Sequence, residues 1–500
     1  MATITREMEQ KYEAPPGTAL PPLRDLPDVA AQSRPRSQTL TAEYYDTDDF
    51  RLLRAQITLR RREGGKDEGW HLKLPDGPAR REVRLPLARS GDPAPGELTE
   101  LVRVHTRDAA LRPVARIETH RRTTTLRDEA GTSLAEVMTD EVAAQTLGRS
   151  ATTVSRWDEI EVELTGGGEK LLRAVDKQLR RGGLRPATYS AKLQRALGTE
   201  PARPRKAPTR HSTAGEVVLA YLDEQAARLK SLDPAVRRGE PDSVHQMRVT
   251  ARRLRSALQS FPMVLSERDV RHLGEELKWL GGVLGDAREA EVLSEQLRSA
   301  LAGLPAELVM DSAAARVRVH FAPQEADART TVGRVLDSGR YFAMLDELDE
   351  LLKVPPFTAK ADAPARGVLS KAVTRTGKRT RRRVNRARHV PAGRDRDAAL
   401  HEVRKAAKRA RYAAEAARPV LGKPARRFAK RMKAVQSVLG DHHDAVNARA
   451  TAREIGVQAH LAGENAFSFG LLHERAHRDA RDYQRESRRA WQRAADGKLM

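Results

Sequence analysis

Hydrophobic and polar positions alternate with a period of two over much of the first 200 residues. Side chains alternate between the two faces of an extended strand, so each such run predicts a strand with one apolar and one charged face. Gly64-Gly65 and Asp76-Gly77 separate neighbouring runs and are typical of hairpin turns. About eight short strands are predicted in this way. The runs lie at residues 7–11, 38–45, 57–62, 69–75, 81–87, 113–126, 133–142 and 157–164.

The pattern changes to helical spacing at Glu169–Arg181, and it stays helical from Thr213 onward. Residues 199–211 are rich in proline and basic residues, which is typical of an extended linker. We therefore predict an α+β multidomain protein with an antiparallel β domain at 1–199, a linker at 200–211 and an all-α domain at 212–500.

The charged strand faces carry both signs. Glu7 and Glu9 share a face with Lys11, whereas Glu159, Glu161 and Glu163 place three like charges on one strand face. Such a row is unfavourable unless it is compensated. An outward, solvated face explains any one strand, but a closed antiparallel barrel with a polar interior explains the set better. Its basic side chains would surround a polyanion, and its carboxylates would hold a hard divalent cation.

The first 200 residues resemble a CYTH domain of the triphosphate tunnel metalloenzyme superfamily. The resemblance rests on motifs that recur in family order along the whole segment. These are E-x-E-x-K at Glu7, Glu9 and Lys11, YYDT at 44–47, ITLRRR ending at Arg62, LKLP around Lys73, EVMTDE at 136–141, EIEVEL at 159–164 and the late Lys192.

The resemblance implies an eight-stranded antiparallel tunnel with flanking helices that hydrolyses the terminal phosphate of triphosphate substrates with Mg²⁺ or Mn²⁺. By position, it assigns phosphate binding to Lys11, Arg60, Arg62, Lys73, Arg84, Arg116, Arg121 and Lys192. It assigns metal binding to Glu7, Glu9, Glu159, Glu161 and Glu163. The catalytic set that it implies is Glu7, Glu9, Lys11, Glu82, Glu136 and Asp140. Within this set, Glu82, Glu136 and Asp140 would either orient basic groups or contribute to a second metal site.

Two positions in this scheme conflict with the strand pattern or with the family. Arg116 and Arg121 have opposite parity, so a β-bulge would be needed to bring both to one face. The stretch 121–125 also departs from the family, which often has a bulky aromatic residue there.

The helical half contains an internal repeat. Residues 244–258 match 400–414, and residues 278–290 match 433–445. On each signature helix, one histidine and three basic residues fall within an arc of roughly 80°. Solvated helix faces normally mix charges of both signs, so a purely basic stripe that occurs twice indicates an anion site. The two stripes are His245, Arg248, Arg252 and Arg255, and His401, Arg404, Lys408 and Arg411.

This half resembles a CHAD domain, the "conserved histidine α-helical domain". The resemblance implies two pseudo-symmetric helical bundles, about 212–340 and 365–500, that bind inorganic polyphosphate. Residues 371–388 add nine basic side chains, which either extend the polyanion surface or form a solvated basic helix. The implied binding residues are His245, Arg248, Arg252, Arg255, Lys278, Arg288, His401, Arg404, Lys408, Arg411, Lys433 and His443.

Composition agrees with a polyanion partner. The formal net charge is +23, whereas aromatic residues make up only 4% of the chain. The charge favours polyphosphate, nucleotides or nucleic acid, but the shortage of stacking side chains makes nucleic acid the weaker expectation. The absence of cysteine excludes thiolate metal sites. With no apolar run that could enter a bilayer, we expect a cytoplasmic protein without a membrane partner, associated with polyphosphate granules.

We therefore expect metal-dependent hydrolysis of inorganic tripolyphosphate or a related triphosphate, together with polyphosphate binding. Three alternatives remain open: a scaffold that binds polyphosphate or nucleotides without turnover, a nucleic-acid-binding protein, and a class IV type adenylyl cyclase that shares the tunnel.

Overall fold

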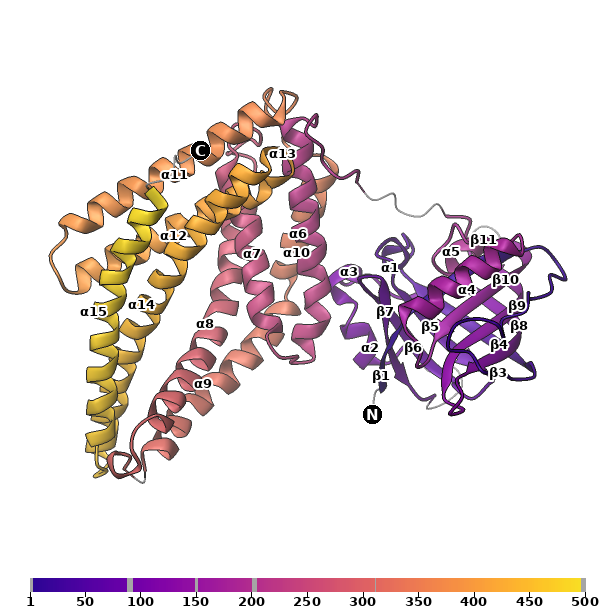
Figure 1. Cartoon of the computed structure of the whole chain (residues 1–500), viewed down its shortest axis with the longest axis horizontal. Coiled ribbons are helices and arrows are strands. Elements are labelled where there is room, and N and C mark those ends of the chain that lie inside the picture. The colour runs from indigo at the N-terminus through magenta and orange to yellow at the C-terminus, as the bar shows by residue number, and fades with distance from the viewer. Residues whose placement is uncertain (1–2, 88–92, 149–151, 200–204, 311, 496–500) are drawn as a thin grey trace. The chain divides into compact units, whose positions relative to one another are not determined.

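The computed structural model describes residues 3–87, 93–148, 152–199, 205–310 and 312–495 (Figure 1). The chain divides into two compact units, Met1–Pro204 and Arg205–Met500. Part of the expected linker, residues 200–204, lies outside the described residues.

The first unit is built on one antiparallel sheet whose strands run in the order β1-β7-β6-β5-β4-β8-β9-β10-β2-β11, with β3 paired to β8. Most strands coincide with the period-two runs of the sequence. Their bounds are β1 Thr3–Glu7, β2 Glu9–Ala14, β3 Ala31–Gln32, β4 Arg36–Asp46, β5 Thr58–Glu63, β6 Gly69–Asp76, β7 Ala79–Leu85, β8 Arg112–Arg127, β9 Ser133–Thr146, β10 Val154–Leu164 and β11 Arg185–Pro186.

The sheet curls because β1 and β2 are two parts of one interrupted strand. Glu7 of β1 is opposite Arg80 of β7, and Glu9 of β2 is opposite Glu163 of β10. At the interruption, the Met8 carbonyl accepts a hydrogen bond from the backbone N–H of Leu164 at 3.0 Å. One stretch of chain thus bonds to both ends of the sheet. Counted as one strand, and leaving aside the two-residue β3 and β11, it completes the expected eight-stranded antiparallel fold.

Apolar faces of β2, β9 and β10, and of β5, β6 and β7, point outward and are covered by helices. In α4, Leu172, Val175 and Leu179 pack in a cluster with Tyr12 and Val162. The predicted helix Glu169–Arg181 is confirmed. The short helices α1 and α2 close a second cluster with β5, β6 and β7. Because these helices cover the apolar faces, the charged faces turn inward. The other helices of this unit are α1 Arg51–Arg54, α2 Gly96–Glu100, α3 Arg103–Thr106 and α5 Lys192–Ala196.

The described part of the second unit is helical apart from short connections and isolated bridges. Its first helix begins at a capping box, in which the Thr213 side chain accepts from the Glu216 backbone and Glu216 accepts from the Thr213 backbone. The helices are α6 Ala214–Arg237, α7 Ser243–Ser260, α8 Arg271–Ala302, α9 Ala313–Leu336, α10 Gly339–Lys353, α11 Ala365–His389, α12 Arg394–Ala416, α13 Arg418–Leu421, α14 Lys423–Leu461 and α15 Phe467–Ala495, with a 3₁₀ turn at Ala306–Leu308.

The sequence repeat relates α7 to α12 and α8 to α14, and the two signature helices, α7 and α12, contact each other. Arg253 of α7 forms an ion pair with Glu415 of α12 at 3.2 Å. At the far end of the bundles, Leu297, Phe321, Ile455 and Phe469 join α8, α9, α14 and α15 in one core. The expected all-α domain of two related bundles is confirmed. Among the described helices, none is both long enough and apolar enough to cross a membrane.

Candidate functional site

The inward strand faces of the first unit surround a cavity of about 410 Å³. Its wall is mostly charged, as the sequence pattern predicted, and every principal strand contributes to it. The acidic and basic side chains that line it are Glu7, Glu9, Lys11, Arg36, Arg60, Arg62, Lys66, Asp67, Lys73, Arg80, Glu82, Arg84, Arg121, Glu136, Glu161, Glu163 and Lys192.

One acidic cluster lies at the seam of the sheet. Oxygens of Glu7, Glu9 and Glu163 fall within 4.8 Å of one another. Lys73 donates a hydrogen bond to Glu7, with Nζ 2.6 Å from Oε2. Glu163 has no hydrogen bond or ion pair within the described part of the chain. Burial and the nearby Glu7 raise the pKa of Glu163 to about 7, and burial also raises the pKa of Glu7.

The remaining member of this cluster is better compensated. Burial opposes ionisation of Glu9, but Lys11 and Lys73 outweigh it and bring the pKa of Glu9 to about 2. Glu7 also pairs with Arg84 at 3.0 Å, so within the described residues Glu163 is the member of this cluster that lacks a cation partner. Three carboxylates in this arrangement offer the oxygen ligands that Mg²⁺ and Mn²⁺ prefer, so the residues fit a divalent cation.

A second acidic cluster, Asp140, Glu159 and Glu161, already surrounds a cation. Lys192 Nζ lies 2.9 Å from Asp140 Oδ2 and 2.7 Å from oxygens of Glu159 and Glu161. Arg121 adds ion pairs to Asp140 at 2.6 Å and to Glu161 at 2.7 Å. The ammonium group occupies the position that a metal ion would need, so these carboxylates are suited to holding Lys192 and Arg121 in place.

The opposite part of the wall is basic. The Arg60 guanidinium donates to the Tyr44 hydroxyl at 3.2 Å. Arg62 forms an ion pair with Asp67. Burial and the nearby Arg60 guanidinium lower the pKa of Arg62 to about 10. Crowding of buried cations in this way is favourable only when an anion is present to share them.

Glu82 connects the two parts of the wall. It accepts from His71 Nδ1 at 2.9 Å and from Arg84, and its carboxylate lies 3.9 Å from Lys73 Nζ. His71, Lys73 and other basic groups outweigh burial and lower the pKa of Glu82. Glu136 lies apart from this network, 3.6 Å from Lys66. Glu82 is therefore in contact with His71, Arg84 and Lys73 at once.

The assignment of Arg116 to phosphate binding is wrong. The pairing of β8 is regular between Arg116 and Arg121, so no bulge corrects their opposite parity. Arg116 lies exposed on the outer face, whereas Arg121 lines the cavity despite its departure from the family pattern. Sequence reasoning also missed Arg80, which lies 3.8 Å from Glu9 and donates to the Ser190 carbonyl at 3.1 Å. Its parity with Glu82 and Arg84 could have identified it.

In the second unit, the two predicted stripes lie on the contacting helices α7 and α12. Buried nitrogens without a hydrogen-bond partner mark both of them. Lys408, Arg252 and Arg404 form no ion pair among the described residues, and burial together with these two arginines lowers the pKa of Lys408 to about 6. Nitrogens without a hydrogen bond are His245 Nδ1, Arg248 Nε, Arg252 Nε, Arg255 Nε, His401 Nδ1, Arg404 Nε and Arg411 Nε, of which Arg411 Nε lies 3.3 Å from Glu415 Oε1.

The repeated LGD motifs explain how the stripe arginines fit. A Cβ atom on Gly285 of α8 would lie 3.2 Å from the Arg248 guanidinium, and one on Gly440 of α14 would lie 3.6 Å from that of Arg404. In both halves, a glycine thus lets a helix backbone approach the arginine closely.

The other predicted polyphosphate residues differ in their surroundings. The His443 and His401 rings lie 4.4 Å apart, centroid to centroid. Arg288 forms an ion pair with Glu291 at 2.7 Å. Burial lowers the pKa of the His245 ring, and the nearby Arg288 lowers that pKa further. Lys278 is exposed and pairs with Glu275 at 2.8 Å, and Lys433 is exposed.

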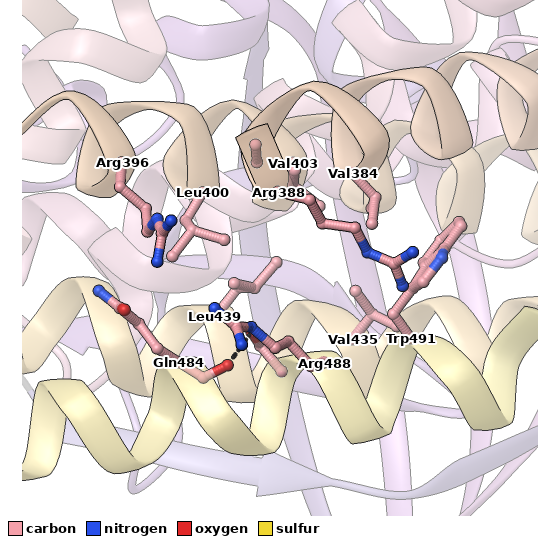
Figure 2. Close-up of a pocket in the computed structure, with 12 residues that line it drawn as sticks. Val384, Arg388, Arg396, Leu400, Val403, Val435, Leu439, Gln484, Arg488 and Trp491 are labelled. Carbon is pink, nitrogen blue, oxygen red and sulfur yellow. Dashed lines mark hydrogen bonds between the residues drawn. The ribbon is translucent and has the colours of Figure 1, made fainter. Parts of the chain in front are cut away.

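A different hollow lies between α11, α12, α14 and α15 (Figure 2). It is lined by apolar side chains such as Val403, Leu439 and Trp491, with Arg388 and Arg488 at its edge. Its volume of about 40 Å³ leaves space for no more than a few water molecules, so it is not a substrate site.

Comparison with known proteins agrees with both units. A CYTH domain model matches residues 5–191, and a CHAD domain model matches residues 220–453. The chain is 36% identical over 485 residues to "Uncharacterized protein Rv2226" of Mycobacterium tuberculosis, which covers 94% of this chain and 92% of that protein.

Solved structures are similar to parts of the chain. PptA from Streptomyces chartreusis is 24% identical with a TM-score of 0.48, covering 56% of this chain and all of that one. The CHAD domain from the plant Ricinus communis is 26% identical with a TM-score of 0.42, covering 54% of this chain and 90% of that one. The two domain models match in the predicted order, and the relative from Mycobacterium tuberculosis matches along 94% of this chain. The chain therefore belongs to the family of proteins in which an N-terminal CYTH domain is followed by a C-terminal CHAD domain.

Proposed function

We propose that the CYTH domain is a divalent-metal-dependent triphosphatase that hydrolyses the terminal phosphate of inorganic tripolyphosphate or a related triphosphate. The observation that carries this proposal is the division of one cavity into two parts. Glu7, Glu9 and Glu163 form an acidic cluster in which Glu163 has no cation partner among the described residues, and Arg60 and Arg62 form a crowded basic wall. A metal–triphosphate complex has the complementary arrangement of charge.

In this mechanism Glu7, Glu9 and Glu163 would hold Mg²⁺ or Mn²⁺, which when bound supplies Lewis-acid polarisation and a more acidic water. Arg60, Arg62 and the neighbouring basic side chains bind the phosphate oxygens and offset the charge that develops on the transferred phosphoryl group.

The remaining ion pairs position these groups. Glu82 fixes Arg84 and faces Lys73, while Asp140 and Glu161 fix Arg121 and Lys192. Charged groups held in this way need little reorganisation during the reaction, which is the main source of electrostatic catalysis.

The test is phosphate release by the full-length protein given tripolyphosphate with Mg²⁺ or Mn²⁺. We expect metal-dependent release that Glu7→Gln/Glu9→Gln loses and that Arg116→Gln, on the outer face, retains. Absence of release from tripolyphosphate, thiamine triphosphate and ATP would contradict the proposal and favour a binding scaffold. Cyclic AMP formation from ATP would instead identify a cyclase.

We further propose that the CHAD domain binds inorganic polyphosphate. Support comes from the unpartnered nitrogens of the two stripes, because buried donors and cations without partners are unfavourable unless a ligand satisfies them. Arg248→Gln/Arg404→Gln should lose polyphosphate binding. Equal competition by duplex DNA at moderate salt would favour nucleic acid as the ligand instead.

A further inference from the structure

The internal repeat places Arg253 of α7 and Arg409 of α12 at equivalent positions, 156 residues apart like Arg248 and Arg404. Arg253 is well compensated. It forms an ion pair with Glu415 at 3.2 Å, and its guanidinium carbon lies 5.5 Å from the centre of the Tyr412 ring.

Arg409 has neither kind of partner. The residues equivalent to Tyr412 and Glu415 in the first copy are Ser256 and Gln259, so the opposite helix offers it no carboxylate and no aromatic ring. Within the described part of the chain, Arg409 forms no hydrogen bond or ion pair. The two halves of the domain are therefore alike in backbone but different in charge at this position.

The groups that surround Arg409 are themselves basic. Arg379 and Arg383 come from α11, one helical turn apart, and Arg255 comes from α7, and both helices pack against α12. The nearby acid, Glu402, forms ion pairs with Arg383 and, at 2.9 Å, with Lys405. Burial and the three arginines lower the pKa of Arg409 to about 10.

Arg255 also belongs to the stripe of α7, with its Nε buried and unpartnered. The basic surface is thus continuous from the stripe, through Arg255, to α11. The basic surface is continuous around Arg409. It is interrupted around Arg253, because Glu415 neutralises that arginine.

We propose that Arg255, Arg379 and Arg409 form an additional anion site that extends the polyphosphate path from the α7–α12 stripes onto α11. The inference rests on the proposed polyphosphate binding and adds a property to it, which is selection for chain length. A short chain contacts the stripes alone. A longer chain also reaches Arg409 and Arg379, and it gains affinity because more of its charges are neutralised.

The test compares short and long polyphosphates on full-length protein by titration calorimetry at several salt concentrations. We expect Arg379→Gln/Arg409→Gln to weaken long-chain binding about 10-fold or more, because two charged contacts with phosphate are lost. The slope of log K against log salt should fall by about 2, and short-chain binding should not change.

Arg253→Gln is the matched control, because it removes the equivalent arginine from the neutralised side. It should lower the melting temperature slightly and leave the length dependence unchanged. Arg379→Gln/Arg409→Gln should not lower the melting temperature of the free protein, since it relieves repulsion.

Three outcomes would overturn the inference. Equal long-chain affinity and salt slope in the variant and the wild type would show that α11 takes no part, with polyphosphate binding intact. Equal weakening of short and long chains would place Arg409 within the stripe site. Failure of the wild type to bind any polyphosphate would refute the proposed function itself.

Discussion

Lys192 Nζ lies 2.7 Å from Glu159 Oε1, and this contact joins the first turn of α5 to the interior face of β10. The lysine also reaches Asp140 and Glu161, so one ammonium group holds three buried carboxylates together. This relationship separates the two acidic clusters of the tunnel. In one, Lys192 pairs with all three carboxylates, whereas the other leaves Glu163 without a cation partner in the described part of the chain.

Replacing Lys192 should therefore destabilise the domain as well as inactivate it. Lys192→Met leaves Arg121 and Lys11 as the remaining cations of this cluster and takes the ion pair from Glu159. Breaking a buried ion pair in this way typically costs about 3–5 kcal/mol. Urea unfolding followed by circular dichroism measures the loss. Arg116→Met, an exposed site on the same unit, should change stability by less than about 0.5 kcal/mol. A stable Lys192→Met protein would show that the carboxylates are protonated or solvated instead.

The pKa of Glu163, raised to about 7, predicts a pH-dependent effect of metal on stability. A carboxyl group with a raised folded pKa binds its proton more tightly when folded, so its contribution is present below about pH 4.5 and is lost as pH rises toward 7. Without metal, the melting temperature should fall over this window. Mg²⁺ or Mn²⁺ should raise it more at pH 7.5 than at pH 5.5.

Glu163→Gln is the control for this prediction, because it removes the titrating group and keeps its shape. It should flatten the pH dependence and reduce the stabilisation by metal. A metal effect of the same size at both pH values in the wild type would contradict the role of Glu163.

Lys408, with a pKa of about 6, should take up a proton when polyphosphate binds. The groups that lower its pKa after burial are basic: Arg252, Arg404, Arg248 and Arg411. A polyanion reverses their effect and favours the charged lysine. Calorimetry at pH 7 in buffers of different ionisation enthalpy should detect net proton uptake, and Lys408→Gln should reduce it. Uptake that is unchanged in Lys408→Gln would assign the proton to His401 or His443.

The two LGD glycines should differ in their tolerance of alanine. In Gly285→Ala, the new Cβ would lie 3.2 Å from Arg248, which is tight enough to displace the guanidinium. In Gly440→Ala, the distance to Arg404 is 3.6 Å, an ordinary contact. We expect Gly285→Ala to weaken polyphosphate binding several-fold and Gly440→Ala to have little effect. Equal behaviour of the two variants would indicate that Arg248 adjusts freely.

Strand parity explains which parts of the tunnel were predictable from the sequence. It correctly indicated an interior of charged side chains, and it already pointed against Arg116, whose assignment by family position was wrong. Strand parity also places Arg80 on the interior face, although this residue was overlooked.

The different environments of the two acidic clusters could not be predicted in this way. Their difference depends on Lys192, which lies in a helix 28 residues beyond the end of β10. Likewise, the repeat predicted both basic stripes, but the environment of Arg409 depends on how α11 packs against α12.

The interruption at Met8 has a consequence for folding. Glu7 and Glu9 are synthesised well before residue 163, yet in the described part of the chain β2 pairs with β10 and β11, near the other end of the domain. Contacts between such distant segments form slowly, because a long loop must close before they contribute. The acidic cluster therefore cannot exist until residue 163 has been synthesised and docked. Completion of the barrel and acquisition of the metal ligands are a single event.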